Sequence, residues 1–208
     1  DYLFENCSGL ETIDIPSAVQ TIGKSAFRSC TNLTEIEIPS SVTNIGCDAF
    51  YYCSNLEKLT LNEGLKTLGA NCFEGTKISS VNIPSTLTAV NMPSYDDHGP
   101  FTGCKSLKNV TFDDKTTKII DYLFDGCSGL EITTIPDTIT NIGNSAFYNC
   151  TALTEVGFRK METLSYYAFQ GCTALKKVFL PLSVQRILAS GYRNSPFYNC
   201  TNPALRIF

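Results

Sequence analysis

The sequence has no tryptophan, two methionines and a single histidine, and none of its apolar runs is long. A membrane-spanning helix needs about 18 or more consecutive apolar residues, so this chain is not expected to insert into a membrane. Basic residues are not in excess either, because 16 Lys and Arg stand against 20 Asp and Glu. Proteins that bind nucleic acid use basic side chains to displace counterions from the phosphates, so the net charge of −4 argues against a nucleic acid partner.

What the sequence does contain is a repeat, in which a phenylalanine is followed three residues later by a cysteine. The segment Ser25-Ala26-Phe27-Arg28-Ser29-Cys30 carries this motif in full. The phenylalanines that keep the phase are Phe4, Phe27, Phe50, Phe73, Phe101, Phe124, Phe147, Phe169 and Phe197. Successive ones are 23 residues apart, except for one step of 22 and two of 28. A fixed period in this range is typical of stacked-repeat proteins.

We therefore predict one repeat solenoid over residues 1–208. It comprises a partial first coil over 1–7, eight coils over 8–200 and the start of a ninth over 201–208. Neither end carries an obvious polar cap, which solenoids need for solubility, and Asp1 falls inside a repeat. The chain is therefore interpreted as a fragment of a longer protein.

Each unit contains recognisable local signals. The alternation Ile13-Asp14-Ile15 predicts a short strand with one buried face, which Pro16 ends because proline cannot donate to a ladder. Val19 and Ile22 predict a second extended segment, and Ala-Phe-x-x-Cys predicts one helical turn. A turn with positive φ is expected at the glycine position shared by Gly23, Gly46, Gly69 and Gly143. Thr133 replaces an expected isoleucine, which predicts a weak point in the ladder.

Ten cysteines in 208 residues would ordinarily suggest a disulfide framework. Eight of them share one repeat position, however, so their side chains should stack in parallel, with Cβ atoms too far apart for bridges. We favour a ladder of buried free thiols, which behave as small apolar groups. Cys47 and Cys72 lie off this ladder, and a bridge between them remains an alternative.

Residues 8–30, 31–53 and 128–150 carry most fully the pattern L-x-x-I-x-I-P-x-x-V-x-x-I-G-x-x-A-F-x-x-C. This pattern resembles the BspA-type leucine-rich repeats, and the resemblance covers essentially the whole chain. It implies a right-handed leucine-rich-repeat horseshoe of short parallel strands, one per coil on the concave face, with one helical turn per coil. Proteins of this family are secreted or surface proteins of gut and oral bacteria and of some mucosal protists, and several are implicated in adhesion. The resemblance implies no catalytic residues.

The residues that could carry chemistry are few. His98 beside Asp96 and Asp97 could share a cation, but a metal site needs more ligands, so a solvated loop is the favoured interpretation. Cys104 near His98 could act as a nucleophile only as a thiolate, whereas its repeat position predicts burial. Glu35, Glu37 and Asp14 should share an open sheet face, which offers no pocket to separate their pKa values. We therefore predict no enzymatic activity, no cofactor and no metal.

Binding surfaces are the stronger prediction. The exposed strand positions run from acidic Asp14, Glu35 and Glu37 through Lys58 to Lys177 and Phe179, and solenoids use such faces to bind extended partners. Two insertions, over 91–100 and 188–196, add Tyr95 and Tyr192, and tyrosine is favoured at recognition surfaces. The predicted function is a protein-binding module of a secreted or cell-surface protein that adheres to host or microbial surface proteins. A structural spacer that displays another domain, or a glycan-binding module, remain alternatives.

Overall fold

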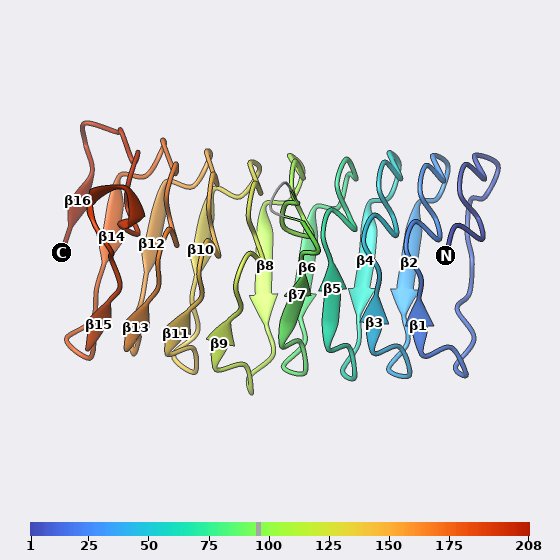
Figure 1. Ribbon diagram of the computed structural model, residues 1–208, viewed down its shortest axis with the longest axis horizontal. Coiled ribbons are helices and arrows are strands. Elements are labelled where there is room, and N and C mark those ends of the chain that lie inside the picture. Colours follow the sequence, from blue (N-terminus) through green and yellow to red (C-terminus); the bar gives the residue numbers. More distant parts are fainter. Residues whose placement is uncertain (95–96) are drawn as a thin grey trace.

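The computed structural model describes residues 1–94 and 97–208 and is a parallel β-solenoid of the leucine-rich-repeat kind (Figure 1). Most coils contribute one strand to each of two rows that run along the long axis. The first row consists of β2 (Glu35–Ile38), β4 (Lys58–Leu61), β6 (Ser80–Ile83), β8 (Asn109–Phe112), β10 (Ile132–Thr134), β12 (Glu155–Gly157), β14 (Lys177–Phe179) and β16 (Arg206–Ile207). The second row consists of β1 (Thr21–Ile22), β3 (Asn44–Ile45), β5 (Thr67–Gly69), β7 (Ala89–Asn91), β9 (Lys118–Ile119), β11 (Asn141–Ile142), β13 (Thr163–Leu164) and β15 (Arg186–Ile187). The predicted solenoid and its second extended segment are confirmed.

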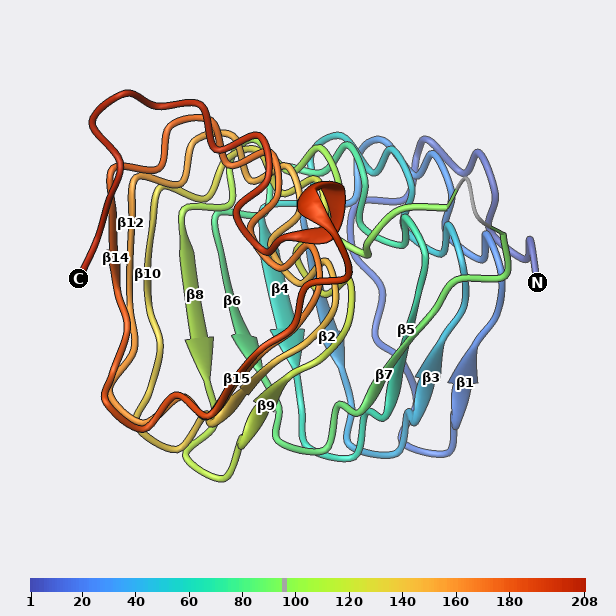
Figure 2. The same cartoon turned by 60° about the vertical axis from the view of Figure 1, so that its left-hand side comes forward.

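Neither row is one unbroken sheet, and the breaks follow irregularities of the sequence. The second row divides between β7 and β9, where the insertion over 91–100 separates consecutive coils (Figure 2). The first row divides into β2–β4, β6–β8 and β10–β12–β14–β16. The division between β8 and β10 falls at the coil in which Thr133 stands for an isoleucine, in keeping with the weak point that the sequence predicts.

The strand predicted at Ile13–Ile15 is not formed, although its equivalents in later coils are. Thr34 N donates to Glu11 O at 3.2 Å, but within the described residues no backbone hydrogen bond joins 12–15 to β2. In the repeat register Asp14 lies opposite Glu37, and like charges placed directly opposite destabilise strand pairing. Repulsion between these two carboxylates therefore opposes the pairing of residues 12–15 with β2.

The core is a continuous stack of phenylalanine rings along the solenoid. All nine repeat phenylalanines stack on their neighbours, with ring centroids 5.0 to 6.1 Å apart. Phe50, Phe73, Phe101, Phe124, Phe147 and Phe169 are fully buried. A buried phenylalanine stabilises by about 1.5–3 kcal/mol relative to an exposed one, so the stack that joins each coil to the next is a major source of stability.

The cysteines form the predicted ladder of free thiols, and all ten are free, Cys47 and Cys72 included. The structure adds a role beyond packing. Cys53 Sγ donates to Phe27 O of the preceding coil at 3.1 Å, and Cys30, Cys104, Cys150, Cys172 and Cys200 repeat this bond at 3.1 to 3.2 Å. Each of these thiols therefore links its coil to the preceding one through a backbone oxygen.

The Ala-Phe-x-x-Cys segments form successive turns, so the predicted helical turn is wrong. The residue before Ala and the residue before Cys both adopt positive φ, as Ser25 (53°) and Ser29 (58°) illustrate, and a right-handed helix does not accommodate that backbone. The described residues contain a single helix, the 3-10 helix η1 (Tyr192–Asn194) in the second insertion. No helix of the described residues is long and apolar enough to cross a membrane.

The prediction of positive φ at the shared glycine position is wrong, and the structure gives another reason for glycine there. Gly23, Gly46, Gly69 and Gly143 do not have positive φ. A Cβ on Gly69 would lie 2.2 Å from Cys47 N, and one on Gly46 would lie 2.6 Å from Lys24 N. These glycines are therefore needed because the backbones of adjacent coils approach too closely for a side chain.

Candidate protein-binding surface

The outward-pointing side chains of the first row form one surface, which we call the polar strand face. Strands β2, β4 and β6 alternate strictly between exposed and buried residues, so that Glu35 and Glu37 point outward while Ile36 and Ile38 are buried. The parallel register places Glu37 beside Thr60, Asn82 beside Thr111 and Gly157 beside Phe179. Period-2 patterning alone therefore identified which residues share this face.

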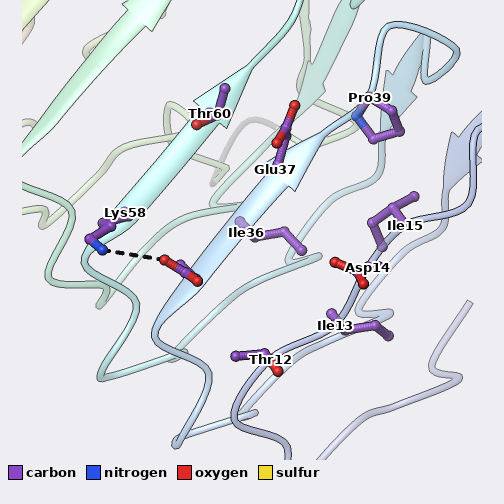
Figure 3. A pocket seen from close by; sticks show the side chains of 10 residues that line it. Thr12, Ile13, Asp14, Ile15, Ile36, Glu37, Pro39, Lys58 and Thr60 are labelled. Atoms are coloured by element: carbon purple, nitrogen blue, oxygen red, sulfur yellow. Dashed lines mark hydrogen bonds and ion pairs between the residues drawn. The ribbon is translucent and has the colours of Figure 1, made fainter.

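At its N-terminal end the polar strand face contains a hollow of about 420 Å³ between residues 12–15 and strands β2 and β4 (Figure 3). Its polar lining consists of Thr12, Asp14, Glu35, Glu37, Lys58 and Thr60. The missing ladder between the first coil and β2 is what leaves this opening. Three carboxylates and one ammonium group give the hollow a negative charge.

The carboxylates of the hollow differ in their partners. Glu35 Oε2 lies 3.3 Å from Lys58 Nζ, and Glu37 Oε1 accepts a hydrogen bond from Asn62 Nδ2 at 2.9 Å. Among the described residues Asp14 has neither an ion pair nor a side-chain hydrogen bond, and Glu37 has no cationic partner. Two negative charges of the hollow are therefore not neutralised by the chain itself.

Toward the C-terminal end of the face, one ion pair joins neighbouring coils. Lys177 Nζ lies 3.6 Å from Glu155 Oε2, one coil earlier. This pairing offsets the charge of the Lys177 side chain. In the centre, Thr111 Oγ1 donates to Asn82 Oδ1 at 2.8 Å. The acidic hollow is consequently the strongest unbalanced charge feature of the face.

The C-terminal end of the face is aromatic. Phe179 is 39% exposed and stacks on Phe208, which is 64% exposed, with ring centroids 5.2 Å apart. Gly157 lies beside Phe179, and a Cβ there would only reach ordinary contact with the ring, at 4.0 Å. Gly157 therefore places no side chain beside the exposed ring of Phe179. Sequence reasoning found Phe179 but missed Phe208, which the repeat register places one coil further on.

Of the two tyrosines predicted from the insertions, Tyr95 lies outside the described residues, as does Asp96. Tyr192 begins η1, and its side chain is outside what the structure describes. The first insertion is held by Asp125, a buried carboxylate whose Oδ2 accepts a hydrogen bond from Gly99 N at 3.3 Å and lies 3.5 Å from His98 Nδ1. Burial raises the pKa of Asp125, and His98 opposes that shift.

The buried thiols, which are the candidate nucleophiles of the ladder, are held in their protonated form. Burial raises the pKa of Cys104 to about 12 and that of Cys53 to about 12, far above the thiolate range needed for attack. Cys47, only partly buried, also has a raised pKa because of desolvation. Within residues 1–94 and 97–208, no group of three or more His, Cys, Asp or Glu is arranged to hold a metal ion.

The comparison with known families agrees with this architecture. The model of the BspA-type leucine-rich repeat region matches residues 1–100 and 97–203, in six copies. The chain belongs to this family. No curated protein matches this leucine-rich-repeat chain significantly.

Solved structures of bacterial leucine-rich-repeat proteins are similar to this family member. The pneumococcal vaccine antigen PcpA matches with a TM-score of 0.52 and 20% identity, over 80% of this chain and 44% of PcpA, which supports the fold. A leucine-rich-repeat protein of Bacteroides ovatus matches with a TM-score of 0.46 and 25% identity, over 88% of this chain and 70% of that one. A leucine-rich cell surface protein of Faecalibacterium prausnitzii matches with a TM-score of 0.41 and 25% identity, over 98% of this chain and 74% of that one.

Proposed function

We propose that this chain is a non-catalytic protein-binding module of a secreted or cell-surface protein, and that it attaches to a host or microbial surface protein. The observation that carries the proposal is the polar strand face, with its acidic hollow at residues 12–15, β2 and β4. Leucine-rich-repeat solenoids present such extended faces to partners. Membership of the BspA-type family favours a role in protein interaction.

A binding role also fits the distribution of the ionisable groups. Most of the thiols are buried, and the carboxylates of the hollow are exposed to water. General acid–base catalysis depends on a pocket that shifts the pKa values of its groups apart. An exposed and uncompensated acidic hollow is instead suited to attracting a partner with basic residues, because complementary charge speeds encounter and selects the partner.

The test is a binding screen of the folded chain against extracellular matrix, plasma and mucin components and microbial surface proteins. A saturable protein hit should weaken as salt is raised. Glu35→Lys with Glu37→Lys should weaken it about tenfold or more, because two attractive contacts become repulsive. Asp114→Lys with Glu162→Lys is the matched control, since both of these residues are exposed and lie outside the polar strand face.

The outcomes separate the alternatives. Equal loss of affinity in both double variants would assign binding to net charge and not to this face. If the folded chain binds none of the proteins in the screen, the result would favour a structural spacer. Binding confined to glycans would favour a glycan-binding module.

A further inference from the structure

The two ends of the polar strand face offer different chemistry to a partner. The N-terminal end is the acidic hollow, where Asp14 and Glu37 have no cation beside them within the described residues. The C-terminal end is the exposed ring of Phe179, beside which Gly157 places no side chain. A partner that contacts both ends therefore needs a basic group at one place and an apolar or aromatic group at another.

In the part of the face between the two ends, strands β6 and β8 present short, uncharged outward side chains, and Glu155 on β12 is paired with Lys177. The outward residues of this part include Thr60, Ser80, Asn82, Asn109 and Thr111, all exposed. Each carries a hydroxyl or amide group on a short side chain, and such groups can donate to and accept from a peptide backbone. This middle section suits an extended polypeptide that lies across the strands and makes few side-chain contacts of its own.

The register of the first row sets the distance between the two ends. Glu37 and Phe179 occupy equivalent positions of β2 and β14, six strand steps apart. With neighbouring strands about 4.8 Å apart, six steps span about 29 Å. An extended chain advances about 3.3 Å per residue, so about nine residues cover this span.

We propose that the polar strand face binds one extended polypeptide segment, with lysine or arginine side chains in the acidic hollow and, about nine residues away, an aromatic side chain against the exposed ring of Phe179, where Gly157 contributes no side chain. This inference rests on the proposed function and gives it a partner chemistry. In this complex the carboxylates of Asp14 and Glu37 gain a cationic partner. Stacking on Phe179 removes exposed apolar surface from water. Because the two contacts are joined in one segment, the second forms at a high effective concentration.

The test uses synthetic peptides in which a Lys-Lys pair and one tryptophan are separated by Ser/Thr spacers of about three, six, nine or twelve residues. The protein has no tryptophan, so the fluorescence of the peptide reports its own environment. We expect the tightest binding and a blue shift for the spacer of about nine residues. We expect affinity at least about tenfold weaker for the spacer of about three, which cannot reach both ends.

Variants assign each end separately. Asp14→Asn with Glu37→Gln should abolish the salt dependence of binding, whereas the control Asp114→Asn with Glu162→Gln should keep it. Phe179→Ser should remove both the blue shift and the spacer preference. Tyr52→Ser, which removes another exposed aromatic ring, is the control for that change and should have no effect.

The inference is overturned if affinity does not depend on spacer length, if the face variants behave like their controls, or if no peptide binds at about millimolar concentration. Those results leave the proposed function standing when the folded chain still captures an intact protein in the screen. Failure of both the peptides and the protein screen would reject the two proposals together.

Discussion

The glycine position at the start of each turn segment offers a test that separates two physical reasons for glycine. Gly69 lies where a Cβ would be 2.2 Å from Cys47 N and 2.3 Å from Gly46 C of the preceding coil. Gly75, in the same coil, has φ of +75° but leaves a Cβ in ordinary contact, at 3.4 Å from the Tyr52 ring. The first glycine is needed for space and the second for its backbone conformation.

Gly69→Ala should therefore destabilise the chain. Relief of the clash requires the two backbones to separate by about 1.2 Å, the difference between 3.4 and 2.2 Å. Overpacking of this kind costs about 1–3 kcal/mol, and backbone against backbone lies at the upper end. Alanine also lowers the conformational entropy of the unfolded chain, and this offsets about 0.4–1 kcal/mol of the destabilisation. The expected net loss is about 2 kcal/mol.

Gly75→Asn should be tolerated within about 0.5 kcal/mol. Asparagine adopts positive φ more readily than most residues, and Asn6, Asn149 and Asn199 already occupy the equivalent position with φ of 54° to 62°. Gly69→Asn, by contrast, should be at least as damaging as Gly69→Ala, because any side chain meets the same backbone.

Urea unfolding followed by circular dichroism measures these differences as shifts of the midpoint. If Gly69→Ala unfolds at the wild-type midpoint, the close approach of the coils does not constrain the fold. If Gly69→Asn is tolerated while Gly69→Ala is not, positive φ and not space is the reason for glycine there. Either result would refute the reasoning from the Cβ contacts.

Three further predictions follow from the core and from the first insertion. Phe124→Ala should cost about 3–5 kcal/mol in urea unfolding, since it interrupts the ring stack; a loss under about 1 kcal/mol would contradict the stack's role. Intact mass after alkylation should show ten modified thiols in denaturant but chiefly Cys7, the exposed one, in the folded chain; fewer than ten in denaturant would indicate a bridge. Burial raises the pKa of Asp125, so the folded state loses stability as pH rises through that raised value. The stability of Asp125→Asn relative to wild type should therefore increase from acid to neutral pH, whereas that of the exposed control Asp114→Asn should not. A stability difference between Asp125→Asn and wild type that does not change with pH would contradict this prediction.

The sequence by itself determined the solenoid, the phenylalanine stack, the cysteine ladder and the two strand rows. Each coil contacts chiefly the next one, so a period of 23 residues translates directly into a stack of equivalent positions. For the same reason the outward residues of the candidate surface, from Glu37 to Phe179, could be aligned without coordinates. Family membership followed from the same periodic pattern.

Only the tertiary structure decided what happens between coils. It placed Lys177 beside Glu155 and, among the described residues, left Asp14 without a cation, because the side chains that meet depend on how one coil is offset from the next. It opened the hollow between residues 12–15 and β2, where the repeat pattern predicted a continuous ladder. It also showed that positive φ occurs in the turns after Gly69 and not at Gly69 itself. Gly69 is needed because the backbones of two neighbouring coils lie close together, and that distance cannot be inferred from the sequence of either coil alone.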